Sequence, residues 1–196
     1  MVPSENLELM WNIEVACRRC IQAAYSFDVS SKSSSNILAF TQNCYGAMCV
    51  IHWCQVFGTC SERTHFSRLF KGGTISCMTK AHAAARIWQS VAMNEEEYEI
   101  FWEGVVNARD KYLVHNDFDA PKRPIFPDLS ILVNACLEMR SILRDIITAN
   151  YVDRDHSLED IPFAIKYYPN EMFLVDVKSE ANSLEKDIFG GENVNL

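Results

Sequence analysis

Apolar residues recur at intervals of three and four along most of the first 150 positions, a spacing that gathers side chains on one face of an α-helix. The first such stretch covers about Asn6–Phe27. The second covers Asn36–Phe57 and is followed by Gly58, a residue type that often ends helices. A shorter helical piece over Thr64–Phe70 leads into the Gly72–Gly73 turn. The pattern therefore predicts two long helices and then a short one.

The next part of the chain continues the helical pattern. An alanine-rich helix is predicted over Ile75–Ala92, and Asn94 with Glu97 three residues later resembles a capping box that starts the following helix. A proline-rich loop over 121–127 interrupts the pattern before a fifth helix over Asp128–Thr148. About five helices, with almost no alternating strand pattern, predict an all-α fold built as an up-and-down helical bundle.

We expect this bundle to occupy residues 1–150 and an acidic C-terminal extension to occupy residues 151–196. The extension holds ten acidic and four basic residues, a net charge of −6 in a chain whose total is −8. Aromatic and β-branched residues over Phe163–Val177 favour an extended arm or a hairpin, and Ser183–Phe189 favours a last helical turn. The extension is therefore expected to be partly irregular and to pack on the bundle or trail from it.

The charge distribution excludes a protein that grips long duplex nucleic acid, because no basic stripe is visible. Any nucleic-acid contact should be local and use a few cations: Arg109, Lys111, Lys122 and Arg123. The amino-terminal residues lack the basic flank and apolar core of an export signal, and eight cysteines in such a chain read as reduced, buried thiols. We expect a cytoplasmic protein without structural disulfides.

The segment from Ser33 to Ser61 contains no Lys, Arg, Asp or Glu, which raises the question of a membrane span. Polar residues interrupt it, among them Gln42, His52 and Gln55, and its flanks carry no charge bias typical of insertion. The segment therefore predicts a central helix buried on most sides, and we expect no membrane contact.

The pair Cys17 and Cys20 has the spacing of a zinc-binding motif. Both residues lie on the apolar stripe of the first helix, and the chain has neither a second Cys-x-x-Cys pair nor a matching pair of histidines. A structural zinc ion needs four protein ligands. The two cysteines are therefore interpreted as packing residues, and no metal and no cofactor is expected.

The fourth helix carries the most informative polar residues. Tyr98, Phe101, Trp102 and Val105 form an apolar stripe that Arg109 extends, so this cation either meets a partner or lines a site. Six residues advance a straight helix by about 600°, which would leave Arg109 and His115 about 120° apart around the axis. The two side chains converge only if the helix ends before His115, and the Asn-Asp pair at 116–117 favours such an end.

An arginine and a histidine are suited to phosphodiester chemistry, since guanidinium matches phosphate oxygens and imidazole titrates near neutral pH. The segment Ala108–Asp117 resembles a motif of the HEPN superfamily, and in particular of its abortive-infection branch. Two upstream segments, Trp53–Gly58 and Thr64–Phe66, are similar to sequences of the same branch. The resemblance implies a metal-independent endoribonuclease with a composite active site at a homodimer interface, acting as a toxin or defence effector. The 2′-hydroxyl of the RNA would be the nucleophile, leaving a cyclic phosphate product.

By match to the motif, His115 would be the general base or acid and Arg109 the phosphate clamp, with Asp110 orienting one of them. A second subunit would supply the complementary acid or base. Three more residues are candidates for substrate binding: Asn116 as a hydrogen-bond donor, Lys111 as a cation, and Tyr112, which could stack on a base or simply pack. The implied partners are RNA, a second copy of the chain and an antitoxin protein.

Other interpretations remain open. Arg109 could pair with a carboxylate such as Asp110, Asp117 or Glu103, while His115 caps the end of the helix. The chain would then be a catalytically inactive HEPN-like module that binds a nucleotide or a protein partner. It could also be a purely structural dimer that uses its acidic tail as an interaction arm.

Overall fold

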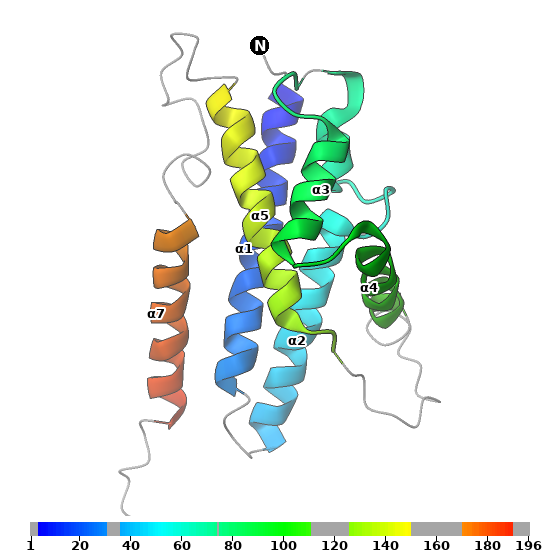
Figure 1. Ribbon diagram of the computed structural model, residues 1–196. Helices are drawn as coiled ribbons and strands as arrows, with labels where there is room; N and C mark the ends of the chain where they lie inside the picture. Colours follow the sequence, from blue (N-terminus) through cyan, green and yellow to red (C-terminus); the bar gives the residue numbers. More distant parts are fainter. Residues whose placement is uncertain (1–3, 31–35, 74, 111–125, 150–169, 190–196) are drawn as a thin grey trace, which may run out of the picture.

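The architecture was obtained as a computed structural model, which describes residues 4–30, 36–73, 75–110, 126–149 and 170–189 (Figure 1). These residues form helices and connecting turns, with no strand among them, so the predicted all-α fold is confirmed. The elements in chain order are α1 (Ser4–Ser30), α2 (Asn36–Phe57), the 3₁₀ helix η1 (Phe66–Gly73), α3 (Lys80–Ser90), α4 (Glu95–Ala108), α5 (Leu129–Ile147) and α7 (Asn170–Phe189).

Three long helices, α1, α2 and α5, lie side by side and form the centre of the bundle (Figure 1). Helix α2 runs antiparallel to α1, and α5 runs in the same direction as α2. Helix α3 packs on α5, and α4 lies at an angle to the long helices, near the C-terminal end of α2. Helix α7 packs along α1, on the opposite side of the bundle from α4. This arrangement places the end of α4 beside the end of α2.

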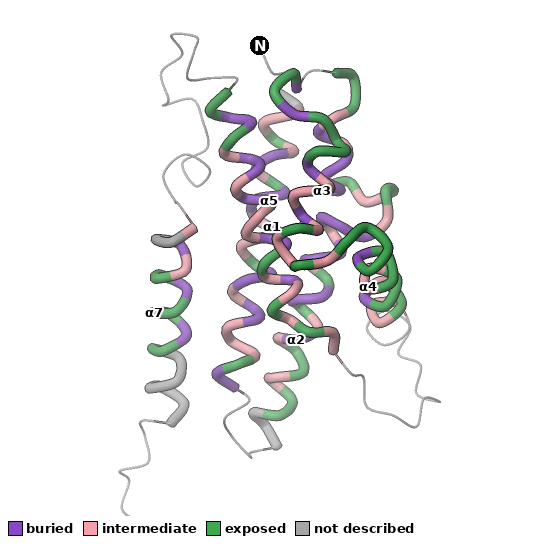
Figure 2. The backbone as a smooth tube through the Cα atoms, viewed as in Figure 1, coloured by how far each residue is buried: buried purple, intermediate pink, exposed green. Residues whose placement is uncertain are grey.

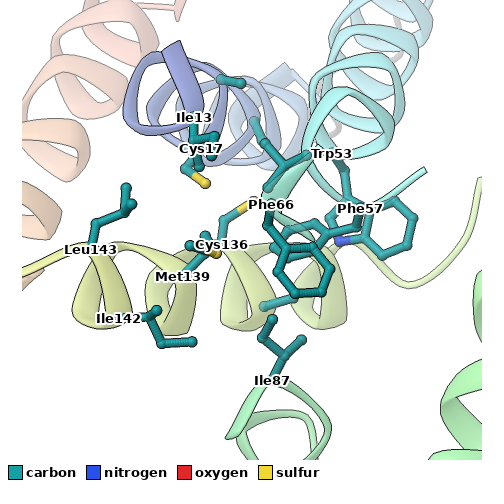
Figure 3. Packing of buried hydrophobic residues seen from close by; sticks show 14 of the residues in the cluster. Ile13, Cys17, Trp53, Phe57, Phe66, Ile87, Cys136, Met139, Ile142 and Leu143 are labelled. Carbon is teal, nitrogen blue, oxygen red and sulfur yellow. The ribbon is translucent and has the colours of Figure 1, made fainter. Parts of the chain in front are cut away.

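The core lies where α1, α2 and α5 face one another (Figure 2). Trp53 is fully buried there, with Ile13 and Cys17 of α1 and Cys136 and Met139 of α5 around it (Figure 3). Helix α2 is less enclosed than its uncharged sequence predicts. One face of α2 is buried in the core, and another face is apolar and exposed.

Caps explain where α3 and α4 begin. Helix α3 starts at Lys80 rather than at the predicted Ile75, because the Thr79 side chain caps it by accepting a hydrogen bond from the backbone N–H of His82 at 3.2 Å. The predicted capping box of α4 is confirmed: the Asn94 side chain accepts from the Glu97 N–H, and the Glu97 carboxylate accepts from the Asn94 N–H, each at 2.9 Å.

The C-terminal segment differs from its prediction. The expected arm or hairpin over Phe163–Val177 is wrong where the structure describes it, because Asn170–Phe189 is a continuous helix. Phe173, Val177 and Ala181 recur every four residues and are buried, so they form the inner stripe of a helix that packs against α1. The aromatic and β-branched content of the segment suggested a strand, whereas the four-residue period decides the outcome.

A buried polar network attaches α7 to the bundle. The Arg140 guanidinium of α5 donates from Nε to both carboxylate oxygens of Glu14 in α1, at 2.9 and 3.0 Å, and from Nη1 to Asn170 Oδ1 at 2.9 Å. It also lies 4.0 Å from the ring centroid of Phe173. One arginine therefore links three helices.

Two further properties bear on the predictions from sequence. All eight cysteines are free thiols in the structure, five of them buried and three exposed. Within the described ranges, no helix combines the length and the apolar character that crossing a bilayer requires.

Candidate functional site

The candidate site begins where α4 ends. Tyr98 and Val105 on the inner stripe of α4 are buried, and Arg109 follows as the capping residue of the helix, with one wider helical turn through Asp110. The Arg109 side chain is 13% exposed. The inner stripe of α4 thus ends in a mostly covered cation, which lies at the edge of the bundle beside α2.

Two carboxylates hold the Arg109 guanidinium. Its Nε donates to Asp110 Oδ1 at 2.7 Å, and its Nη1 lies 3.4 Å from Glu62 Oε1. The hydrogen bond that Arg109 donates to Asp110 is the largest cause of the raised pKa of Arg109, and the negative charge of Glu62 raises this pKa further. The pairing of Arg109 with Asp110 that the sequence suggested is therefore present. The role of the pair in catalysis stays a prediction.

The carboxylates around Arg109 remain open to solvent. The side chains of Glu62 and Asp110 are 39% and 47% exposed. Ion pairs in which the carboxylate stays solvated contribute modest net stability, so either carboxylate can exchange the guanidinium for water. Among the described residues, Nη2 of Arg109 has no hydrogen-bond partner. Nε and Nη1 therefore hold the arginine in position, and Nη2 is the nitrogen left to bind another group.

The end of α2 forms the floor beside Arg109. The last carbonyls of this helix are satisfied by side chains: Trp102 Nε1 donates to Phe57 O at 2.6 Å, and Thr64 Oγ1 donates to Gln55 O at 2.8 Å. A Cβ atom at Gly58 would lie 2.3 Å from Cys54 O and 3.2 Å from Arg109 Nη1, so glycine is required.

These contacts show what the two upstream segments that resemble the abortive-infection branch do in the fold. Trp53–Gly58 and Thr64–Phe66 build the closed end of α2 on which α4 rests. Glu62 could not be predicted from the sequence, because it lies in the connection after α2 and follows no helical period. Only the folded chain brings Glu62 to Arg109.

His65 is the described histidine nearest this end of α2, and its role is structural. Its Nδ1 accepts from the Ser67 backbone N–H at 3.2 Å and bonds the Ser67 hydroxyl at 2.7 Å. Burial lowers its pKa to about 4, and the charge of Lys80 adds to the effect, while a hydrogen bond to the Gly58 backbone opposes it. His65 is therefore neutral at neutral pH and already satisfied, which makes it a poor acid–base catalyst.

Four of the predicted site residues lie outside the described residues: Lys111, Tyr112, His115 and Asn116. Helix α4 is described to Ala108 and its last turn to Asp110. Whether the helix ends before His115, and whether His115 converges on Arg109, remain predictions. Of the alternative carboxylate partners, Asp110 contacts Arg109, and Asp117 lies outside the described residues.

The pair Cys17 and Cys20 is not isolated in the fold. Cys49 of α2 and Cys136 of α5 join it in the core, and Cys20 Sγ lies 3.5 Å from Cys49 Sγ. Burial raises the pKa of Cys17 and of Cys136, which favours their protonated thiols. In the described part of the chain, no group of three or more His, Cys, Asp or Glu side chains is arranged to hold a metal ion.

Comparison of the chain with models of protein families, with curated proteins and with solved structures found no match.

Proposed function

We propose that the protein is a metal-independent endoribonuclease of the HEPN type that works as a homodimer. The observation that supports the proposal best is the placement of Arg109, which is held by Asp110 and Glu62 at the end of an inner helix stripe, with Nη2 unpaired among the described residues. A phosphate oxygen could bind at Nη2 directly, and displacement of Glu62, whose contact with Nη1 is the longer one at 3.4 Å, would free the Nη1–Nη2 edge to bind two phosphate oxygens at once. The sequence resemblance supplies the expectation that His115 lies close to it.

In the proposed reaction, one His115 removes the proton of a 2′-hydroxyl, and the 2′-oxygen attacks the adjacent phosphorus. Arg109 stabilises the negative charge that grows on the phosphoryl oxygens. The bond to the 5′-oxygen breaks, and the His115 of the second copy donates the proton that this leaving group takes up. The products are a cyclic phosphate and a 5′-hydroxyl. No metal ion is required for these steps.

The exposed face of α2 supports the dimer. Phe40, Cys44, Met48 and Ile51 lie at offsets of four, eight and eleven residues, which places them on one side of the helix. They are all exposed, Phe40 to 71% and Met48 to 44%. An exposed apolar stripe of this length is typical of an interaction surface.

A second copy of the chain is the occupant that the charges favour. The chain carries a net charge of −8, so two copies repel each other over most orientations, but the segment 33–61 contains no charged residue. Contact of this face with itself across a two-fold axis would avoid like-charge repulsion. Gly58, which approaches Arg109, falls on the same side of α2 as Phe40, since eighteen residues complete about five helical turns. The dimer contact would therefore lie next to the candidate site.

A second function has one observation in its favour. Because Glu62 and Asp110 already compensate the charge of Arg109, the cluster has a net charge of −1 and resembles a finished ion-pair network. This favours a catalytically inactive HEPN-like module that binds a nucleotide or a protein partner. For the active form, we propose a role as a toxin or defence effector in the cytoplasm, controlled by an antitoxin protein.

RNA cleavage by the wild type, Arg109→Ala and His115→Ala, with a chelator present and a 2′-deoxy substrate in parallel, tests the proposal. We expect cleavage by the wild type that ignores the chelator and spares DNA, and loss of cleavage in both variants. Arg86→Ala is the matched control, because Arg86 also binds two carboxylates, Glu138 at 2.7 Å and Asp145 at 2.6 Å, at the α3–α5 contact. Cleavage that survives both site substitutions would refute the ribonuclease. A wild type that binds RNA without cutting it would favour the inactive module.

A further inference from the structure

A cavity of about 360 Å³ lies between α3, α4 and the end of α2. Five aromatic side chains line it: Phe57, Phe66, Trp88, Tyr98 and Trp102. Three charged residues also line it, Lys80, Glu95 and Glu99, and all three are exposed. The cavity is therefore an apolar slot with a charged mouth, which is the usual composition of a small-ligand site.

The walls of the cavity are fixed before any ligand arrives. Trp102 is anchored through its Nε1 donation to Phe57 O, and the rings of Phe57 and Phe66 lie 5.9 Å apart. His65 packs on Phe66 at 5.0 Å between ring centroids and is neutral for the reason given above. A preformed aromatic slot binds a flat ring without a large ordering cost.

The charges at the mouth select which part of a nucleotide can enter. Two carboxylates, Glu95 and Glu99, and one cation, Lys80, give the mouth a net charge of −1, which disfavours a phosphate group, while the carboxylates accept hydrogen bonds from the amino group of a base. Adenine and cytosine each carry such an exocyclic amino group on the pairing edge, and so does guanine, beside its N1–H. Uracil presents carbonyl oxygens on both sides of its N3–H, and these oxygens would face the carboxylates unfavourably.

The cavity lies close to the candidate phosphate clamp. Trp102 and Arg109 are seven residues apart on α4, so they lie on the same face, about 10 Å apart along the helix axis. Gly58 lines the cavity and also approaches the Arg109 guanidinium. An RNA strand whose phosphate rests at Arg109 could therefore place a neighbouring base in the slot.

We propose that this cavity binds one unstacked, amino-bearing base of the RNA substrate and so sets a base preference next to the cut. The inference rests on the proposed function for the identity of the ligand. The base would stack on the aromatic walls and donate its amino hydrogens to Glu95 or Glu99. Its phosphate would remain outside the acidic mouth, on the side of Arg109.

The test uses the intact protein and short single-stranded 2′-O-methyl RNAs of one base each, which bind without being cut because the 2′-hydroxyl is blocked. Tryptophan fluorescence reports binding, since Trp88 and Trp102 line the cavity. We expect adenine and cytosine oligomers to bind about tenfold more tightly than the uracil oligomer. Glu99→Gln should weaken this preference several-fold.

Glu96→Gln is the matched control, because Glu96 is exposed on the same helix but does not line the cavity. It should leave the preference unchanged. Equal affinity for the three oligomers, no binding at all, or a preference that survives both Glu95→Gln and Glu99→Gln would overturn the proposal. A base preference without cleavage of ordinary RNA would refute the ribonuclease and leave the pocket standing. Cleavage without a base preference would do the reverse.

Discussion

Two arginines of this chain bind carboxylates in opposite environments. The Arg140 side chain is 3% exposed and its partner Glu14 is 2% exposed, in the interior between α1, α5 and α7. The Arg109 side chain is 13% exposed, and its partners Glu62 and Asp110 are 39% and 47% exposed, at the edge of the bundle. The same chemical groups therefore form a closed network in one place and an open one in the other.

The difference shows that burial decides whether a polar group only stabilises the fold or can also bind a ligand. Removing one partner of a buried pair leaves a charge without water, which is costly. Removing one partner of the open cluster leaves a charge that solvent can reach, which costs little. Separating Arg109 from its carboxylates therefore costs little free energy, and a ligand can compete for the guanidinium. Separating Arg140 from Glu14 costs much more.

The largest effect is expected from Arg140→Ala. This substitution leaves Glu14 buried without its cation and removes the Asn170 and Phe173 contacts, so we expect a loss of about 3–5 kcal/mol in the free energy of unfolding. Urea denaturation measures it, and Arg140→Lys provides a milder variant if the alanine variant does not fold. A loss below about 1 kcal/mol in both variants would show that the closed network is not structural.

Arg109→Ala should have the opposite signature. We expect RNA cleavage to fall by about a hundredfold to a thousandfold, because a transition-state contact is lost, while the free energy of unfolding changes by about 1 kcal/mol or less. Arg109→Lys keeps the charge but loses the planar fork, so its activity should be intermediate. If Arg109→Ala unfolds the protein as strongly as Arg140→Ala, the two clusters are equivalent and the comparison fails.

The pH dependence of stability tests whether His65, next to the end of α2, is a buried neutral group. The pKa of His65 is lowered to about 4 from an unfolded value of about 6.5, so the unfolded chain binds a proton more readily in that window. Stability should be complete above about pH 6.5 and should fall by up to about 3 kcal/mol as the pH drops toward 4.

His65→Gln should flatten this pH slope in urea denaturation. The control is His82→Gln, because His82 is exposed on α3. An identical slope in the wild type and in His65→Gln would contradict the assignment of His65 as a buried neutral group.

The exposed apolar residues allow a further contrast between faces of the bundle. Ile51→Glu on α2 should shift a dimer toward the monomer by about tenfold or more in dissociation constant, because two copies of the new charge would meet across the interface. Val175→Glu on α7 is the control, since Val175 is 65% exposed and lies on the other side of the bundle. Analytical ultracentrifugation measures both. Equal behaviour of the two variants would remove α2 as the interface.

The smallest effect is expected from Glu62→Gln. Glu62 contacts Arg109 at 3.4 Å and is half-exposed, so stability should change by about 0.5 kcal/mol or less. RNA affinity should rise, because one negative charge next to the proposed phosphate site is removed. A clear loss of affinity, measured by a binding titration, would mean that Glu62 is needed to position the arginine.

The sequence predicted what depends on local pattern. The capping box at Asn94 and Glu97 and the stripe that leads to Arg109 follow from spacings within one helix, and both are present. The last turn of α7, over Ser183–Phe189, was predicted, but its first part was missed because the composition of Phe163–Val177 suggested an extended arm or hairpin. The inner stripe of this helix is explained only by its burial against α1. Glu62 was missed because a loop residue meets Arg109 only through the tertiary fold.

The chain's cysteines show the same limit. Cys17 and Cys20 are one helical turn apart, which the sequence makes plain, but their meeting with Cys49 depends on how α1 and α2 pack. The proposed convergence of Arg109 and His115 would be of this second kind. It requires α4 to end before His115, and the complete site requires a second copy of the chain.

The most direct measurement determines RNA cleavage and the free energy of unfolding on the same preparations of Arg109→Ala and Arg140→Lys. We predict that Arg109→Ala keeps its unfolding free energy within about 1 kcal/mol of the wild type and loses cleavage. Arg140→Lys should lose stability and, while folded, keep cleavage. If Arg109→Ala cleaves RNA as well as the wild type does, or loses activity only in proportion to its loss of stability, Arg109 is a structural residue and the proposed site is refuted.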